Sequence, residues 1–218
     1  MTEPSRNRVT IGPMSRVHVL RHGHVHNPDG VLYGRLPEFR LSDTGERMAQ
    51  AVADHLVSSG AKVGRVVASP LLRAQQTAAP VAAAFGVEIV TDERIIEADN
   101  AFAGGPTPTP LALAHPRNWW LLRNPFRPSW GEPYKEQAAR MHAAIVDAAA
   151  ANPGSETVMV SHQLPIWVAR CAAQGRSFVH DPRSRECALA SLTSFDVDGD
   201  AVVFAGYSAP AAHIEAPK

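Results

Sequence analysis

The sequence lacks two features that would point to particular classes of protein: many cysteines and an excess of charge. Its only two cysteines are Cys171 and Cys187, and they show no CxxC spacing, which excludes a disulfide framework. We expect both thiols to be free and buried. Basic and acidic residues number 21 each, so no charge excess favours a nucleic acid or an anionic membrane as partner. Any binding site for an anion must therefore be local.

The sequence also lacks a hydrophobic run long enough to span a bilayer. Residues 1–15 are polar, are interrupted by Pro4, Gly12 and Pro13, and have no apolar core of the kind found in a signal peptide. We therefore expect a soluble cytoplasmic protein whose residues 1–15 form a disordered lead-in. The length of residues 16–218 is typical of a single domain.

Short apolar runs alternate with segments of helical periodicity along most of the chain. The runs predict strands, and the periodic segments predict helices. Two alternating runs around Asp198-Gly199-Asp200 predict an antiparallel hairpin. The pattern indicates an α/β domain with three α/β/α layers, a mostly parallel sheet and an antiparallel hairpin at its edge. The expected strands cover 17–21, 65–69, 87–91, 157–161, 189–197 and 201–207, and the expected helices cover 42–60, 70–85, 134–151 and 166–173.

Residues 104–133 interrupt this alternation. Prolines recur there, and Trp119, Trp120, Phe126 and Trp130 stand among arginines. We interpret the stretch as an irregular, aromatic-rich insertion. Two roles fit this composition: a structural flap whose aromatic side chains join the core, and a lid that sets substrate choice.

Three of the expected strands run into polar residues at their carboxyl ends. One ends in Arg21 and His22, a second ends at Ser69 with Arg73 close behind, and a third is followed by His162. If these strands are parallel neighbours, their carboxyl ends open onto one crevice. Two guanidinium groups and two imidazoles in one crevice suit the oxygens of a phosphoryl group.

The local context of these residues also indicates an anion as ligand. Ser69 followed by Pro70 predicts an N-cap and the first position of a helix, which places Arg73 in the first turn. A cation is disfavoured at a helix N-terminus, and an anion bound among the free N–H groups would remove that conflict. The arginine charges also oppose protonation of His22, which keeps its lone pair available near neutral pH.

Four short sequence motifs follow one another along the chain, and their order matters as much as their residues. They are Arg21-His22-Gly23, Leu41-Ser42-Asp43-Thr44-Gly45, Ser69-Pro70-Leu71-Leu72-Arg73-Ala74-Gln75-Gln76-Thr77-Ala78, and Val160-Ser161-His162 with Pro165-Ile166. Together they resemble the signatures of the histidine phosphatase superfamily, in its phosphoglycerate mutase-like branch. Gly131-Glu132 followed by Arg140 is similar to a weaker block. The resemblance covers roughly residues 16–204 and implies a phosphoglycerate mutase-like fold.

The resemblance implies a phosphatase that needs neither a metal nor a cofactor and acts on a small phosphomonoester. In the family's mechanism, His22 would attack phosphorus and form a phosphohistidine, which water would then hydrolyse. Arg21, Arg73 and His162 would bind the oxygens of the transferring group.

The resemblance also implies a proton donor for the leaving oxygen. Glu97 matches the family's usual position for this acid, and Glu93 and Asp99 are its local rivals. Asn27 and the backbone N–H of Gln163 are further candidates to donate hydrogen bonds to the phosphate.

Three departures from the family's pattern bear on the reaction. His24 stands where the family commonly has Glu or Gln, Val25 stands where a hydroxyl residue often contacts substrate, and Asn27 comes one residue earlier than in the mutases. Residues 104–133 also lack the segments that surround a phosphoglycerate mutase site. These differences favour hydrolysis over mutase-type transfer.

Three other functions remain as alternatives. A mutase would move the phosphoryl group between positions of a phosphoglycerate and release little free phosphate. A protein of the same fold could bind phosphoesters without turnover. A metal enzyme would use His22, His24 and His26, which would share one face if the first strand continued, although Gly23 argues against that continuation. The sequence gives no indication of the oligomeric state.

Overall fold

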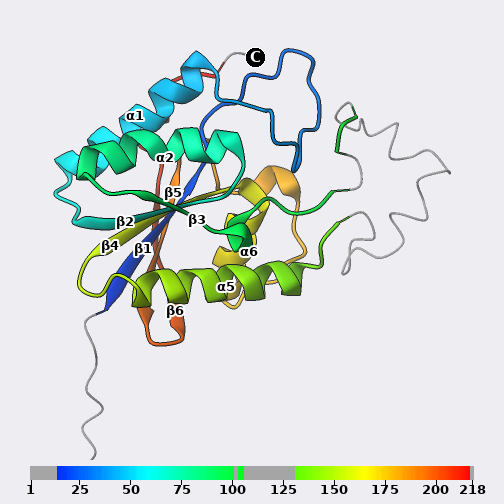
Figure 1. Ribbon diagram of the computed structural model, residues 1–218. Helices are drawn as coiled ribbons and strands as arrows, with labels where there is room; N and C mark the ends of the chain where they lie inside the picture. The colour runs from blue at the N-terminus through cyan, green and yellow to red at the C-terminus, as the bar shows by residue number, and fades with distance from the viewer. Residues whose placement is uncertain (1–13, 101–102, 106–130, 217–218) are drawn as a thin grey trace, which may run out of the picture.

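The computed structural model describes residues 14–100, 103–105 and 131–216. Its centre is a six-stranded sheet with the order β3-β2-β4-β1-β5-β6 (Figure 1). The strands are β1 (Ser15–Arg21), β2 (Val63–Ala68), β3 (Ile89–Thr91), β4 (Glu156–Ser161), β5 (Leu192–Asp198) and β6 (Ala201–Ser208). The helices are α1 (Asp43–Ser58), α2 (Leu72–Phe85), α5 (Tyr134–Ala150) and α6 (Gln163–Ala173), with the short 3₁₀ helices η1 (Glu93–Ile95) and η3 (Pro182–Ser184).

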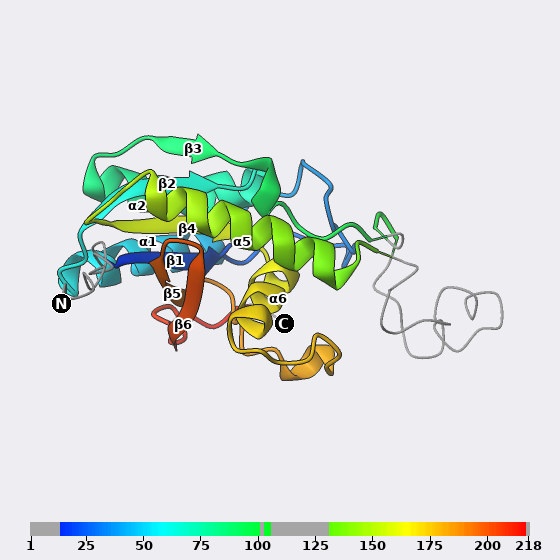
Figure 2. The same ribbon diagram turned by 90° about the horizontal axis from the view of Figure 1, so that it is seen from below.

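The helices cover both faces of the sheet, with α1 and α2 on one face and α5 and α6 on the other (Figures 1 and 2). Side chains of β1 alternate between the two resulting cores. Leu20 packs in the core beneath α1 and α2, whereas Val17 and Val19 pack in the core beneath α5 and α6. Because the strand is buried on both faces, its sequence is an almost continuous apolar run. The three-layer α/β prediction is confirmed.

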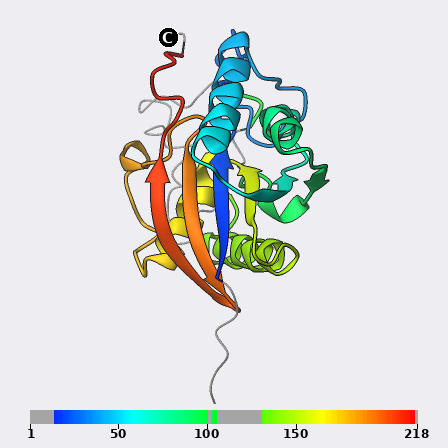
Figure 3. The same ribbon diagram turned by 90° about the vertical axis from the view of Figure 1, so that its left-hand side faces the viewer.

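The parallel part of the sheet consists of β3, β2, β4 and β1, and β5 and β6 continue it as an antiparallel hairpin (Figure 3). The strand β4 lies between β1 and β2, so the three strands with polar carboxyl ends are direct neighbours. Arg21 on β1 is in register with Ser161 on β4, and Ala68 on β2 is in register with Val160. The predicted shared edge is therefore present.

The start of α2 differs from the prediction. The helix begins at Leu72 with Leu71 as its N-cap residue, so neither the Ser69 cap nor the Pro70 first position is correct. The Ser69 hydroxyl has another partner, because its Oγ lies 2.8 Å from Nε2 of His162 on the neighbouring chain segment. The shorter bond of this hydroxyl is thus to a distant segment, and its contact with the N–H of Leu71 is 3.5 Å long.

Several boundaries also shift. The first strand begins at Ser15, one residue before the expected start of the domain. The fifth strand begins at Leu192, three residues later than the expected start at 189. Both cysteines are buried and free, as predicted.

Most of the 104–133 insertion, including its four aromatic residues, lies outside the described residues. None of the helices that the structure describes is both long and apolar enough to span a bilayer.

Candidate active site

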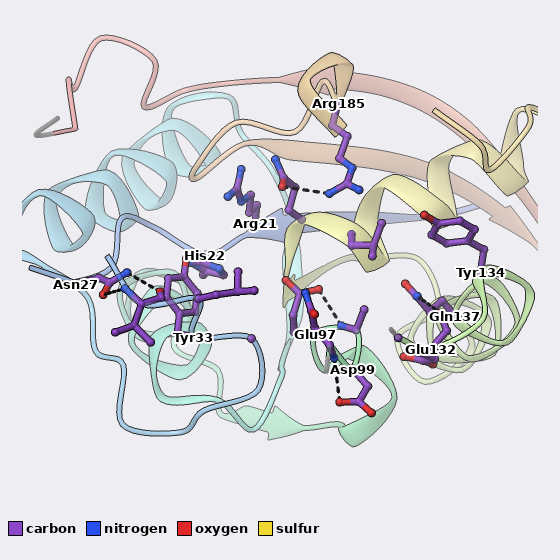
Figure 4. A pocket seen from close by; sticks show the side chains of 18 residues that line it. Arg21, His22, Asn27, Tyr33, Glu97, Asp99, Glu132, Tyr134, Gln137 and Arg185 are labelled. Atoms are coloured by element: carbon purple, nitrogen blue, oxygen red, sulfur yellow. Dashed lines mark hydrogen bonds between the residues drawn. The ribbon is translucent and has the colours of Figure 1, made fainter. Parts of the chain in front are cut away.

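A cavity of about 320 Å³ lies at the carboxyl end of the parallel strands (Figure 4). Segments that are distant in sequence form its wall: the end of β1, the loop that follows it, residues 97–100, the start of α5 and the start of α6. Of the predicted site residues, Arg21, His22, Asn27, Glu97 and Gln163 line this cavity. Arg73 and His162 are fully buried next to it.

His22 is held in one orientation at the end of β1. Its Nδ1 lies 2.8 Å from the carbonyl oxygen of Gly23, and only 2% of the residue is exposed. A carbonyl oxygen only accepts hydrogen bonds, so Nδ1 carries the proton and Nε2 keeps a free lone pair. The Gly23 N–H donates to Oγ1 of Thr77 at 3.1 Å, which ties the turn after the strand to α2.

The backbone after His22 passes very close to the first turn of α1. A Cβ on Gly23 would lie 2.6 Å from the carbonyl oxygen of Gly45, and a Cβ on Gly45 would lie 2.0 Å from the carbonyl oxygen of His24. Side chains at these two positions would collide with backbone atoms that cannot move away easily. The two glycines therefore allow the contact that fixes the position of His22.

His162 faces His22 from the end of β4. The centroids of the two imidazole rings lie 5.2 Å apart, and His162 is fully buried. Its Nε2 bonds with the Ser69 hydroxyl, whose oxygen also accepts from the N–H of Leu71 at 3.5 Å. When the Ser69 hydroxyl donates to Nε2, Nδ1 of His162 carries the proton and is a neutral donor.

Arg21 and Arg73 add two guanidinium groups. Arg21 donates through Nη1 to the carbonyl oxygen of Cys187 at 2.6 Å. Arg73 donates to the carbonyl oxygens of Gly34 at 2.5 Å and Leu36 at 3.2 Å. Within the described residues, Nε of Arg21, Nε of Arg73 and Nδ1 of His162 are buried without a hydrogen-bond partner. Such unpaired buried donors are costly, and an anion between them would remove the cost.

Burial and charge keep both imidazoles neutral. Desolvation lowers the pKa of His22 well below 6.5, and the charges of Arg21 and Arg73 lower it further. Desolvation likewise lowers the pKa of His162 well below 6.5, followed by the effect of His22. A neutral His22 has the lone pair that a nucleophile needs.

Glu97 follows η1 and lines the cavity (Figure 4). Desolvation raises the pKa of its carboxyl group, although the hydrogen bond from the Ala98 N–H to Oε1, at 2.8 Å, acts in the opposite direction. Of the two rivals, Asp99 also lines the cavity but is exposed, and Glu93 is not part of the cavity wall. Glu97 is thus the carboxyl group that burial favours in its protonated form.

The two further donor candidates are placed differently. Both ends of the Asn27 side chain bond to the backbone of Val31, at 2.9 and 3.0 Å, so its amide mainly shapes the loop and has one N–H left. Gln163 is the first residue of α6, where a backbone N–H has no acceptor within the helix. That N–H lies at the positive end of the helix dipole, where binding of an anion is favoured.

The histidine trio does not form a shared face. The strand ends at Arg21, the Nδ1 of His24 lies 2.7 Å from Oγ of Ser42, and His26 is exposed. In the part of the chain that the structure describes, no group of three or more His, Cys, Asp or Glu side chains could hold a metal ion.

Several cavity residues were not predicted from the sequence, and two of them, Tyr33 and Arg185, contribute a ring and a charge. Tyr33 lies over the Arg73 guanidinium at 4.7 Å and meets the His22 ring edge-on at 6.4 Å. Arg185 reaches the cavity from the segment between η3 and β5. Both lie in irregular segments without periodicity, so no sequence signal marked them.

Comparisons with known proteins agree with this geometry. A family model described as "Histidine phosphatase superfamily (branch 1)" matches residues 17–209. An uncharacterized protein of Mycobacterium tuberculosis is 53% identical over 199 residues, which cover 91% of this chain and 98% of that protein. A protein of Yersinia enterocolitica named probable phosphoglycerate mutase is 30% identical over 160 residues, covering 70% of this chain and 72% of its own length.

The fold also matches solved structures. A phosphoserine phosphatase mutant from Entamoeba histolytica, in complex with phosphoserine, superimposes with a TM-score of 0.74 and covers 93% of this chain and 100% of its own. The two sequences are 18% identical, so this likeness concerns the fold.

Proposed function

The chain belongs to the histidine phosphatase superfamily, branch 1, and on that premise we propose that it hydrolyses small phosphomonoesters through a phosphohistidine at His22. One observation carries this proposal. Arg21, Arg73 and His162, the residues expected to bind a phosphoryl group, each have a buried nitrogen without a hydrogen-bond partner in the described part of the chain, and these residues lie near a neutral His22. A phosphoryl group in this position would satisfy all three donors.

In the first step, Nε2 of His22 attacks phosphorus in line with the ester oxygen. The P–N bond forms, the P–O ester bond breaks, and the leaving oxygen takes the proton of Glu97. In the second step, a water molecule gives a proton to the Glu97 carboxylate and attacks phosphorus. The P–N bond then breaks, inorganic phosphate leaves, and His22 and Glu97 return to their starting states.

The cationic groups stabilise the charge on the transferring oxygens. Arg21 and Arg73 supply positive charge, while His162 and the Gln163 N–H supply neutral donors. These groups are held before substrate binds, because β1 and β4 are neighbours in the sheet and α2 packs against it. Positioning and electrostatics are the main contributions a protein makes to phosphoryl transfer.

Phosphate release in EDTA tests this function. The native protein should release phosphate from at least one member of a panel of small phosphomonoesters, and His22→Ala should release none. His55→Ala is the matched control, because His55 is an exposed histidine near the end of α1. Equal release by native protein and His22→Ala would exclude His22 as the nucleophile, and activity that depends on added metal would favour a metal enzyme.

Mutase-type transfer is the second candidate, supported by the 30% identity to the protein named probable phosphoglycerate mutase. A mutase must keep its phosphohistidine away from water until the intermediate has reoriented. Incubation with a phosphoglycerate distinguishes the two reactions, because hydrolysis yields glycerate and free phosphate, whereas transfer yields the positional isomer with little free phosphate.

A further inference from the structure

Arg185 is a further cationic residue of the cavity, separate from the strand ends that carry Arg21 and His22. It lies between η3 and β5 and lines the cavity together with Glu97, Tyr134 and Gln163. Figure 4 shows Arg21 and Arg185 along one side of the cavity and Glu97 and Asp99 along the other. A group bound at His22 would therefore extend into a space that Arg185 borders.

The Arg185 side chain is held by a neutral partner. Its Nε donates to Nε2 of His180 at 2.7 Å, and Nδ1 of His180 lies 2.6 Å from the carbonyl oxygen of Phe178. Because that carbonyl only accepts, Nδ1 of His180 carries the proton and Nε2 accepts from the arginine. The centroid of the His180 ring lies 5.4 Å from that of Trp167 and 6.3 Å from that of Tyr134, so two aromatic rings pack against this support.

In the described part of the chain, Arg185 has no carboxylate partner in an ion pair. Among the ion pairs formed by residues 14–100, 103–105 and 131–216, none includes this arginine. Residues 106–130 contain neither aspartate nor glutamate. Glu132, another carboxylate of the cavity wall, is already bonded to Arg140 at 2.6 Å and to Arg35 at 3.1 Å.

A partly buried guanidinium without a counter-ion is costly unless a ligand supplies one. Burial lowers the pKa of Arg185, and the nearby Tyr134, Glu97 and Cys187 only partly oppose this effect. The remaining free donors are in the Nη groups, since Nη1 makes only a long contact of 3.5 Å to Oε1 of Gln163. A planar guanidinium with free Nη donors matches the geometry of a carboxylate.

We propose that Arg185 is a specificity-determining residue that binds a carboxylate on the alcohol portion of the substrate. This inference rests on the proposed phosphatase function and names its substrate class as phosphorylated hydroxy acids. The transferring phosphoryl group already has donors from Arg21, Arg73, His162 and the Gln163 N–H, which leaves Arg185 for a second anionic group. The cavity of about 320 Å³ suits a phosphoryl group with a few further heavy atoms, so the carboxylate lies a short distance from phosphorus.

Two matched substrate pairs test this role, because the members of each pair differ in the carboxylate. They are 3-phosphoglycerate with glycerol 3-phosphate, and phosphoserine with phosphoethanolamine. The native protein should favour the carboxylated member of each pair. Arg185→Met should lower kcat/KM for the carboxylated member roughly 10- to 100-fold, mainly by raising KM. It should change kcat/KM for the member without a carboxylate by less than about threefold.

Arg183→Met is the matched control, because the Arg183 side chain is 91% exposed and lies two residues away. It should leave kcat/KM unchanged for both members of each pair. If Arg185→Met lowers kcat/KM equally for both members, Arg185 binds the transferring phosphate or supports the loop, and the proposal is overturned. The absence of any native preference for the carboxylated members also overturns it.

Binding separates this proposal from the proposed function. Calorimetric titration of the same pairs into His22→Ala and into His22→Ala/Arg185→Met measures recognition without turnover. The single variant should bind the carboxylated member more tightly, and the double variant should lose that preference. If His22→Ala shows this preference while the native protein releases no phosphate, the hydrolysis proposal fails and the role of Arg185 stands. Equal affinities, or no measurable binding, contradict the role of Arg185.

Discussion

At the scale of single residues, burial acts on His22 and Glu97 in opposite directions that serve one reaction. It lowers the pKa of the imidazole and raises the pKa of the carboxyl group, which favours the neutral form of each group. A neutral imidazole is a nucleophile, and a protonated carboxylic acid is a proton donor. In the proposed mechanism, these two side chains with perturbed pKa values divide the acid and nucleophile roles between them.

Glu97→Gln tests the acid role. With an alkyl phosphate, the variant should lose roughly 10²- to 10⁴-fold in kcat, because the leaving alkoxide needs a proton. With p-nitrophenyl phosphate, whose phenolate leaves without one, the burst of p-nitrophenolate should keep nearly the native rate. Stopped-flow absorbance and phosphate release give the two rates. The control Glu93→Gln alters an exposed carboxylate and should change neither rate. If Glu97→Gln slows the reaction equally with both substrates, Glu97 is not the acid.

The buried histidines should make the fold less stable in acid. The folded pKa of His162 lies well below the unfolded value of 6.5, so below pH 6.5 the unfolded chain binds a proton that the folded chain does not. The free energy of unfolding therefore has its full value above this pH. Below it, the free energy of unfolding decreases by up to about 1.4 kcal/mol per pH unit for each such histidine. Urea unfolding between pH 7.5 and 5.5 should show a smaller decrease for His162→Asn than for native protein. His55→Ala should show the native decrease, and identical slopes for His162→Asn and native protein would contradict this account.

At the scale of elements, the site depends on how closely α1 approaches the end of β1. Ser42 caps α1 by accepting from the Gly45 N–H at 3.1 Å, and its own N–H donates to the carbonyl oxygen of His24 at 3.0 Å. This places the first turn of the helix directly against the turn that follows His22. The approach leaves no room for a Cβ at Gly45.

Gly45→Ala should therefore reduce the free energy of unfolding by roughly 1–3 kcal/mol or more, because the new Cβ would collide with a backbone carbonyl. Urea denaturation measures this change, and the activity should fall as well, since His22 is displaced. Gly206→Ala is the control: Gly206 lies on β6, and a Cβ there would have no atom within 4 Å. If both variants are equally stable, the close approach is not a constraint on the fold.

At the scale of the whole molecule, balanced charge conceals a local concentration of cations. The chain has no net charge, yet Arg21, Arg73 and Arg185 act on the same cavity. Some arginines elsewhere have carboxylate partners, as Arg94 does with Asp92 and Asp147. The cavity therefore combines several cations in a chain whose charges balance overall.

The sequence predicted what depends on regular elements. Arg21, His22 and His162 could be placed because strand ends follow from apolar runs, and parallel neighbours bring such ends together. Tyr33 and Arg185 could not, because irregular segments are positioned by tertiary contacts, such as the packing of Tyr33 against Arg73. The predicted Ser69 cap was wrong for a related reason, since the Ser69 hydroxyl also bonds with His162, 93 positions away.

The central claim is that His22 carries the phosphoryl group during turnover. Rapid acid-free quenching of the native protein with a good substrate, followed by peptide mass spectrometry, should detect a phosphoryl group on the peptide that contains His22. The adduct should be stable in alkali, labile in acid, and absent from His22→Ala. Turnover without an adduct, or an adduct at another residue, would contradict the mechanism.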